Sequence, residues 1–187
     1  WGWYFYITWL PTYIREGRGV NIEFGAVLAG LPLFLGGLGS LFCGQILPPL
    51  GRRLGDIRRA RRTMAIIGCA GASLLLVLSA RLENPVYAMI AMGFSSFCND
   101  LVMPPAWGAC MDVGGKYAGT LAGSMNMMGN FAGGIAPIVV GYILAWTGQD
   151  WGLTILISAG IYFLGTFCWM FLDPVTPLDE APAAPAA

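Results

Sequence analysis

The chain has 187 residues, of which 57% are hydrophobic and only 11% are charged, with ten basic residues balanced by ten acidic ones. A soluble domain carries about 25% charged residues, so this composition excludes an ordinary soluble fold and indicates an all-α integral membrane protein. The net charge of zero provides no general attraction to nucleic acid.

Apolar runs of about 20 residues, the length that crosses a bilayer, recur along the chain. We predict six spans, at residues 1–14, 24–50, 63–80, 85–111, 118–146 and 151–172. The chain does not begin with Met and its first run is short, so we expect a fragment whose first helix is truncated. The Pro- and Ala-rich segment 173–187 cannot build a core, and its composition predicts a disordered cytoplasmic tail.

The loop 51–62 sets the expected orientation, because it contains six arginines and a single acid, Asp56. Short loops with such a basic excess lie on the cytoplasmic side of the membrane. We therefore expect this loop and the C-terminus to be cytoplasmic in a multi-pass protein of the bacterial inner membrane. Binding of lipid or nucleic acid is the alternative interpretation of the arginines.

The five cysteines lie inside or at the ends of the apolar runs, without C-x-x-C spacing, and the chain has no histidine. This pattern predicts small packing residues and neither a metal site nor a disulfide, and we expect no cofactor. An enzyme is disfavoured as well, since membrane-embedded catalysis needs a nucleophile with a base or clustered acids.

A weak internal repeat relates two parts of the chain. Leu28-Ala29-Gly30 reappears as Leu121-Ala122-Gly123, and Pro11 corresponds to Pro104 at the same shift. With 27 glycines in the chain, such matches arise easily by chance. The shift moves the first span onto the fourth, so the repeating unit has three spans, and an odd number of spans inverts the second copy.

Two amides lie one helical turn apart in the fifth span, Asn126 and Asn130. Together with Gly134, Pro137 and Gly141 they line one face of a helix. An unpaired amide in hydrocarbon costs several kcal/mol, so this face should meet other helices or a wet cavity. The alternative to substrate binding is a hydrogen bond between helices, worth about 0.6 kcal/mol.

The fourth span carries one acid near its middle, Asp100, which shares a helical face with Ser96, Met103 and Trp107. Ser96 and Trp107 are candidate substrate contacts on this face. Intramembrane acids are functional candidates, so Asp100 is a possible proton site, with a structural hydrogen bond to Asn99 as the alternative. In the first span, Tyr4 and Trp9 could stack on a substrate or could only pack and anchor the helix.

Several of these segments together resemble the seventh to eleventh helices of major facilitator carriers. The resemblance is strongest to the anion:cation symporter branch, which includes hexuronate, galactonate, glucarate and phthalate carriers, sialin and the vesicular glutamate transporters. It lies in Thr8-Trp9-Leu10-Pro11-Thr12-Tyr13, the Gly-rich second span, the arginine loop, and Asn126-Met127-Met128-Gly129-Asn130 leading to Pro137 and Gly141.

This resemblance implies a parent protein of twelve helices, of which the chain supplies the C-terminal six as two inverted three-helix repeats. The missing partner would be an N-terminal six-helix half. The resemblance also implies alternating-access symport of a small organic anion with protons, and it places Asn126 in the substrate site. A carrier of another class, such as drug or sugar efflux, and a channel-like or non-transporting module are the alternatives.

One departure from the family concerns the loop after the eighth helix, where members have Gly-x-x-x-Asp-Arg-x-Gly-Arg-Arg and the acid latches a cytoplasmic gate. This chain keeps Arg52 and Arg53 but has proline at the acid's place. The latch is then either weaker, or Asp56 replaces the missing acid.

Overall fold

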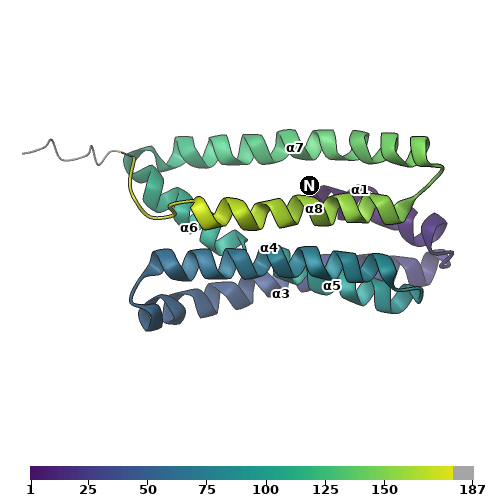
Figure 1. Cartoon of the computed structure of the whole chain (residues 1–187), viewed down its shortest axis with the longest axis horizontal. Helices are drawn as coiled ribbons and strands as arrows, with labels where there is room; N and C mark the ends of the chain where they lie inside the picture. Colours follow the sequence, from purple (N-terminus) through teal and green to yellow (C-terminus); the bar gives the residue numbers. More distant parts are fainter. Residues whose placement is uncertain (179–187) are drawn as a thin grey trace, which may run out of the picture.

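The chain folds into helices that run side by side in a computed structural model (Figure 1). The structure describes residues 1–178, except the side chains of Ile22 and Phe24. Within the described residues there is no strand. The elements are α1 (Gly2–Thr8), α2 (Leu10–Thr12), the π-turn η1 (Tyr13–Gly17), α3 (Ile22–Leu54), α4 (Ile57–Arg81), α5 (Pro85–Asp100), α6 (Met103–Gly114), the 3₁₀ turn η2 (Gly115–Tyr117), α7 (Ala118–Thr147) and α8 (Trp151–Phe171).

Among residues 1–178, four helical segments are long and apolar enough to cross a membrane: Gly25–Leu54, Ile57–Arg81, Pro85–Thr147 and Trp151–Phe171. The all-helical membrane class predicted from composition is therefore confirmed. The third segment, which contains α5, α6 and α7, covers two of the predicted spans. The count of six spans and the inverted repeat stay predictions.

Local sequence signals account for where several helices begin and end. Asp56 caps α4 by accepting the Arg58 N–H at 2.8 Å, Asn84 caps α5 by accepting the Val86 N–H at 2.9 Å, and Asp150 caps α8 by accepting the Leu153 N–H at 2.9 Å. Such side-chain oxygens satisfy donors that have no partner in the first helical turn. Gly148, with φ of 67°, ends α7 in the left-handed conformation that glycine adopts without strain.

The span predicted at residues 85–111 is interrupted between α5 and α6. Two turn residues, Leu101 and Val102, separate the helices, and α6 continues with Pro104 and Pro105. Proline has no N–H, so the carbonyl groups of Asp100 and Leu101 lose the bonds that a continuous helix would give them. The prolines therefore explain the break, which lies directly after the mid-span acid.

Glycines bring α3 and α4 into close contact with the end of α5. A Cβ atom at Gly39 of α3 would collide with the Phe97 carbonyl oxygen, and one at Gly68 of α4 would lie 2.6 Å from the Cys98 carbonyl oxygen. Only glycine permits such backbone approach, as in other membrane helix pairs. The last turn of α5 is consequently enclosed on two sides.

Helix α7 is much less enclosed and lies at one edge of the bundle, opposite α3, α4 and α5 (Figure 1). Only four of its residues are buried, namely Gly133, Ala136, Val140 and Leu144. Its exposed side chains include Met127, Phe131 and Tyr142. This helix therefore presents most of its surface to whatever surrounds the chain.

The end of α4 opposite its Asp56 cap is held by a single arginine. Arg18, just after η1, donates to the carbonyl oxygens of Leu82 at 2.6 Å and Ser79 at 2.9 Å. Its Nε also donates to the Tyr13 hydroxyl at 2.6 Å. Carbonyls at a helix C-terminus have no partner within the helix, so Arg18 fixes this end of α4 to the first helices.

Candidate functional site

One of the two amides of α7, Asn130, bonds to α1. The Tyr4 hydroxyl donates a hydrogen bond to Asn130 Oδ1. Asn130 Nδ2 in turn donates to the Asn126 carbonyl oxygen at 2.8 Å and lies 3.2 Å from Asn126 Oδ1. Tyr4, Asn130 and Asn126, all predicted from the sequence as substrate contacts, are thus brought into one connected group.

Further along α7, aromatic rings of the first helices pack against small residues of α7. A Cβ atom at Gly133 would collide with the Tyr4 ring, and Trp9 Nε1 donates to the Pro137 carbonyl oxygen at 3.2 Å. The ring of Trp9 also lies beside Gly141. Gly134, which we expected on this face, has no neighbour within 4 Å among the described residues. Gly133 makes this contact instead, because the face of α7 that meets the first helices is displaced by one residue from the predicted face.

The two amides differ in what their polar atoms still have available. Asn130 uses both its oxygen and its nitrogen in the bonds to Tyr4 and Asn126. Asn126 Nδ2, by contrast, makes no hydrogen bond within the described part of the chain, and both side chains are exposed. Two N–H donors of Asn126 are therefore free to bind a hydroxyl or carboxylate oxygen.

A second polar group lies at the end of α5, where Asn99 Nδ2 donates to Asp100 Oδ1 at 2.6 Å. Gly36 of α3 faces this group, since a Cβ atom there would lie 2.7 Å from Asp100 Oδ2 and 2.9 Å from Ser96 Oγ. Asp100 is half-buried, and none of the ion pairs among the described residues includes it. The structure therefore brings Ser96, Asn99 and Asp100 together and leaves the acid without a cation.

Trp107 does not join either group. It lies beyond the helix break, on α6, and is 38% exposed. The shared face predicted for Ser96, Asp100 and Trp107 assumed a continuous helix, and the interruption at residues 101–102 invalidates that spacing. Nor do the hydrogen bonds of the described residues link the α1–α7 group to the α5 group.

The arginine loop places its residues in different surroundings. Arg52 and Arg53 are exposed and have no ion-pair partner within residues 1–178. Asp56 caps its own helix and lies 3.8 Å from Arg59 Nε, also in α4. Among the described residues, Asp56 therefore makes no link from α4 to another helix.

The link between helices at this end is made by a pair that sequence reasoning missed, Arg61 and Asp112. Arg61 Nη2 lies 2.6 Å from Asp112 Oδ2, which joins the start of α4 to the end of α6. Both residues flank predicted spans on the same side of the membrane, and that opposite-charge placement was the available signal. Which of the six arginines meets the acid depends on helix rotation, which periodicity in an arginine-rich stretch does not fix.

The described residues contain no group of three potential metal ligands, and the five cysteines are free. Away from the ends of the predicted spans, the polar side chains are mainly amides and hydroxyls, with Asp100 as a carboxylate. Such groups bind and orient a small polar molecule by hydrogen bonds.

Comparison with known proteins gives one family and a consistent set of relatives. Residues 1–137 match the Major Facilitator Superfamily. The chain is 32% identical over 180 residues to a probable sulfoacetate transporter of Cupriavidus necator, covering 96% of this chain and 42% of that protein. It is also 32% identical over 162 residues to a probable galactarate/D-glucarate transporter of Escherichia coli, covering 86% of this chain and 35% of that protein.

A plant protein extends this set, the probable chloroplastic anion transporter 4 of Oryza sativa, which is 28% identical over 169 residues. The match covers 90% of this chain and 28% of the plant protein. The chain thus spans less than half the length of each of these three relatives.

Proposed function

This chain belongs to the Major Facilitator Superfamily, and we propose that it is the C-terminal six-helix half of a secondary transporter for small organic anions. The names of the relatives support the substrate class, since they are transporters of sulfoacetate, of galactarate and glucarate, and of anions. The match to less than half of each relative supports a missing N-terminal half.

Two structural features support an arrangement as two inverted three-helix units. Pro11 and Pro104, equivalent in the weak repeat, each lie at an interrupted helix, between α1 and α2 and between α5 and α6. Tyr4 and Phe97 are equivalent as well, and each meets a glycine of the other unit: the Tyr4 ring lies against Gly133, and the Phe97 backbone lies against Gly39. The two glycines are one residue away from equivalence, since Gly133 corresponds to Ser40. A pseudo-twofold axis between inverted units predicts such reciprocal contacts.

The observation that carries the substrate proposal is the free amide of Asn126. Its Nδ2 has no acceptor within the described part of the chain, whereas Asn130 is held by Tyr4 and Asn126. Asn126 donates to a hydroxyl or carboxylate oxygen of the anion, and Asn130 and Tyr4 orient it. Trp9 borders the same helix contact and limits the site on one side.

The negative charge of the substrate needs a cation that this part of the protein does not place at mid-membrane. Its basic side chains lie at helix ends and in the turns between them, as with Arg52 and Arg58 at one end and Arg18 at the other. A buried anion without a cation is costly, so the N-terminal half supplies the charge. This division leaves hydroxyl and shape recognition to α1 and α7.

Coupling to protons is proposed for Asp100. Its carboxylate has one hydrogen-bond donor, Asn99, and lies against Gly36 without a basic partner in the described chain. An ionisable residue inside the membrane is a candidate for a proton relay, and the adjacent helix break allows movement. In this proposal the protein lies in the bacterial inner membrane, and residues 51–62 and the C-terminus face the cytoplasm.

The test uses the full-length protein in liposomes, with glucarate and sulfoacetate as substrates and an imposed proton gradient. Saturable, gradient-driven uptake is expected, and single-channel conductance in its place would contradict a carrier. Asn126→Ala should raise KM about tenfold, the effect of losing one or two hydrogen bonds to an anion. The matched variant Gly129→Ala lies on the same helix in open space and should leave KM unchanged.

A further inference from the structure

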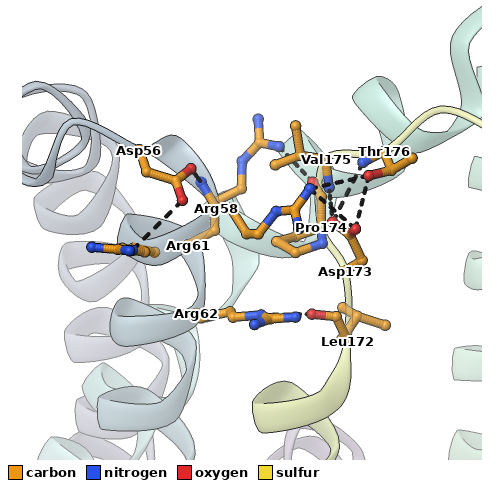
Figure 2. Close-up of polar contacts among 10 residues, drawn as sticks. Asp56, Arg58, Arg61, Arg62, Leu172, Asp173, Pro174, Val175 and Thr176 are labelled. Atoms are coloured by element: carbon orange, nitrogen blue, oxygen red, sulfur yellow. Dashed lines mark hydrogen bonds and ion pairs between the residues drawn. The ribbon is translucent and has the colours of Figure 1, made fainter.

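Three arginines at the start of α4 contact the residues that follow α8 (Figure 2). Arg62 Nε donates to the Leu172 carbonyl oxygen at 2.7 Å, and Arg61 Nη1 donates to the Pro174 carbonyl oxygen at 2.7 Å. Arg58 Nη2 lies 3.2 Å from Asp173 Oδ2. Arg58 Nη2 also donates to the Thr176 hydroxyl at 3.1 Å. Arg61 and Arg62 follow Arg58 by three and four residues, so the three arginines share one face of α4, and two of their four contacts go to backbone carbonyls of the segment.

Arg61 is the anchor of this region. It is only 7% exposed, and its guanidinium reaches both Pro174 and Asp112 of α6. Gly108 provides the space, since a Cβ atom there would lie 3.1 Å from Arg61 Nη2. Its Nη1 and Nη2 each have one partner, while its buried Nε has none among the described residues. Hydrogen bonds from a charged donor are among the stronger polar contacts in proteins. Losing it leaves the carboxylate of Asp112 and the Pro174 carbonyl without their partner.

The segment itself is shaped by a short turn. Asp173 accepts the Val175 N–H at 3.1 Å and the Thr176 hydroxyl at 2.8 Å. The Thr176 hydroxyl, the backbone N–H groups and Arg58 hold the pKa of Asp173 below its usual value, so this carboxylate stays charged opposite Arg58. Pro174 is fully buried in the turn.

Beyond the turn, the segment reaches α6. The Leu178 N–H donates to the Val113 carbonyl oxygen at 2.9 Å, next to Asp112. Residues 173–178 are therefore held by α4 and α6, in contrast to the disordered tail that composition predicts from Asp173 onward. The rest of that predicted tail, residues 179–187, lies outside the described part of the chain.

From these contacts we propose that residues 172–178 form a strap that fastens the ends of α4, α6 and α8 to one another. The strap controls how freely α6 moves, because α6 is separated from α5 by the break at residues 101–102. The far end of α6 bonds to Leu178 of the strap and to Arg61 of α4, which in turn bonds to Pro174 of the strap. Releasing the strap allows α6 to pivot at the break. This inference concerns movement and goes beyond the proposed transport activity.

Hydrogen–deuterium exchange on the full-length protein in lipid nanodiscs tests the strap without any transport measurement. Arg61→Gln is expected to speed exchange about tenfold or more at the end of α6, residues 107–114, the effect of losing a charged hydrogen bond. Arg59→Gln removes the same charge from an exposed neighbour that pairs only with Asp56 of its own helix. Equal exchange in the two variants would overturn the proposal.

A deletion keeps the test decisive if Arg61→Gln does not fold. Removing residues 173–187 from the full-length protein takes away all of the strap except Leu172 and leaves the Arg61–Asp112 pair in place. Exchange at residues 107–114 should then rise, by less than in Arg61→Gln, while exchange around Arg18, at the opposite end of α4, stays as in the parent protein. Unchanged exchange at residues 107–114 would refute the strap, whatever the transport activity of the variant.

Discussion

Helices α5 and α7 are both apolar helices with a few polar side chains, but these side chains are packed against other helices in α5 and exposed in α7. In α5, glycines of α3 and α4 press on the last turn, and Ser95 donates to the Ala72 carbonyl oxygen at 2.9 Å. In α7, Asn126 and Asn130 are exposed, and among the described residues Asn130 bonds to Tyr4 of α1 and to Asn126. Tight backbone contact consumes hydrogen-bonding groups, whereas an open face keeps them available for a ligand.

The largest expected effect on stability comes from adding a methyl group where α3 and α5 are in close contact. Gly39→Ala places a methyl group against the Phe97 carbonyl oxygen, a backbone atom that cannot rotate away. Overpacking of this kind costs about 1–3 kcal/mol, which exceeds the gain in helix propensity of about 1 kcal/mol. The thermal midpoint of the full-length protein in detergent should fall.

The matched control is Gly37→Ala, two residues away on α3, where no atom lies within 4 Å among the described residues. Its midpoint should stay or rise, since alanine favours the helix by about 1 kcal/mol. If both variants had the same midpoint, the close α3–α5 contact would be wrong.

A second variant tests whether Asp100 of α5 has a different role from the exposed amides of α7. Asp100→Asn keeps the shape of the side chain and removes its charge, and Asp100 has no ion pair among residues 1–178 to lose. We expect the variant to fold, to exchange substrate across the membrane, and to lose at least about tenfold in proton-driven accumulation if Asp100 carries the proton. Full accumulation would assign coupling to another residue.

On the open side, Gly133→Ala tests how firmly the first helix is seated on α7. A Cβ atom at this position meets the Tyr4 ring, which is a side chain and can shift, so the expected cost is about 1 kcal/mol. Gly134→Ala, the adjacent position with no neighbour within 4 Å, is the control. Thermal unfolding of the two variants should differ, and combining Gly133→Ala with Tyr4→Ala should reduce the cost.

The smallest expected effect is that of Tyr4→Phe, which removes the hydroxyl that donates to Asn130. Hydrogen bonds between membrane helices are worth about 0.6 kcal/mol on average. A double-mutant cycle with Asn130→Ala, followed by thermal unfolding, measures this coupling. A coupling energy near zero would mean that the bond orders the amides without stabilising the helix pair.

Much of the local structure could be predicted from the sequence. The starts of α4, α5 and α8 follow from Asp56, Asn84 and Asp150, residues that accept hydrogen bonds from free helix N–H groups. The grouping of Asn126 and Asn130 follows from their four-residue spacing. These features involve neighbours in the chain, so they need no knowledge of how helices pack.

The failures lie where distant segments meet or a helix is interrupted. Helical spacing groups Trp107 with Ser96 only if the helix is continuous, and it points to Gly134 where Gly133 makes the contact. The sequence does not distinguish Arg61 from its five neighbouring arginines. Helical periodicity locates the contacting face of a helix to within about one residue. In a closely packed bundle, one residue decides whether a position touches a neighbouring helix or faces open space.

The sequence by itself determined that the chain is an all-helical membrane protein, because apolar length and scarce charge leave no other way to satisfy the backbone in a bilayer. Only the tertiary structure decided that Tyr4 holds Asn130, that Asp100 lies against Gly36 without a cation, and that Arg61 joins Asp112 to Pro174. Each of these contacts joins different helices, and their partners depend on helix rotation and depth, which hydropathy does not encode.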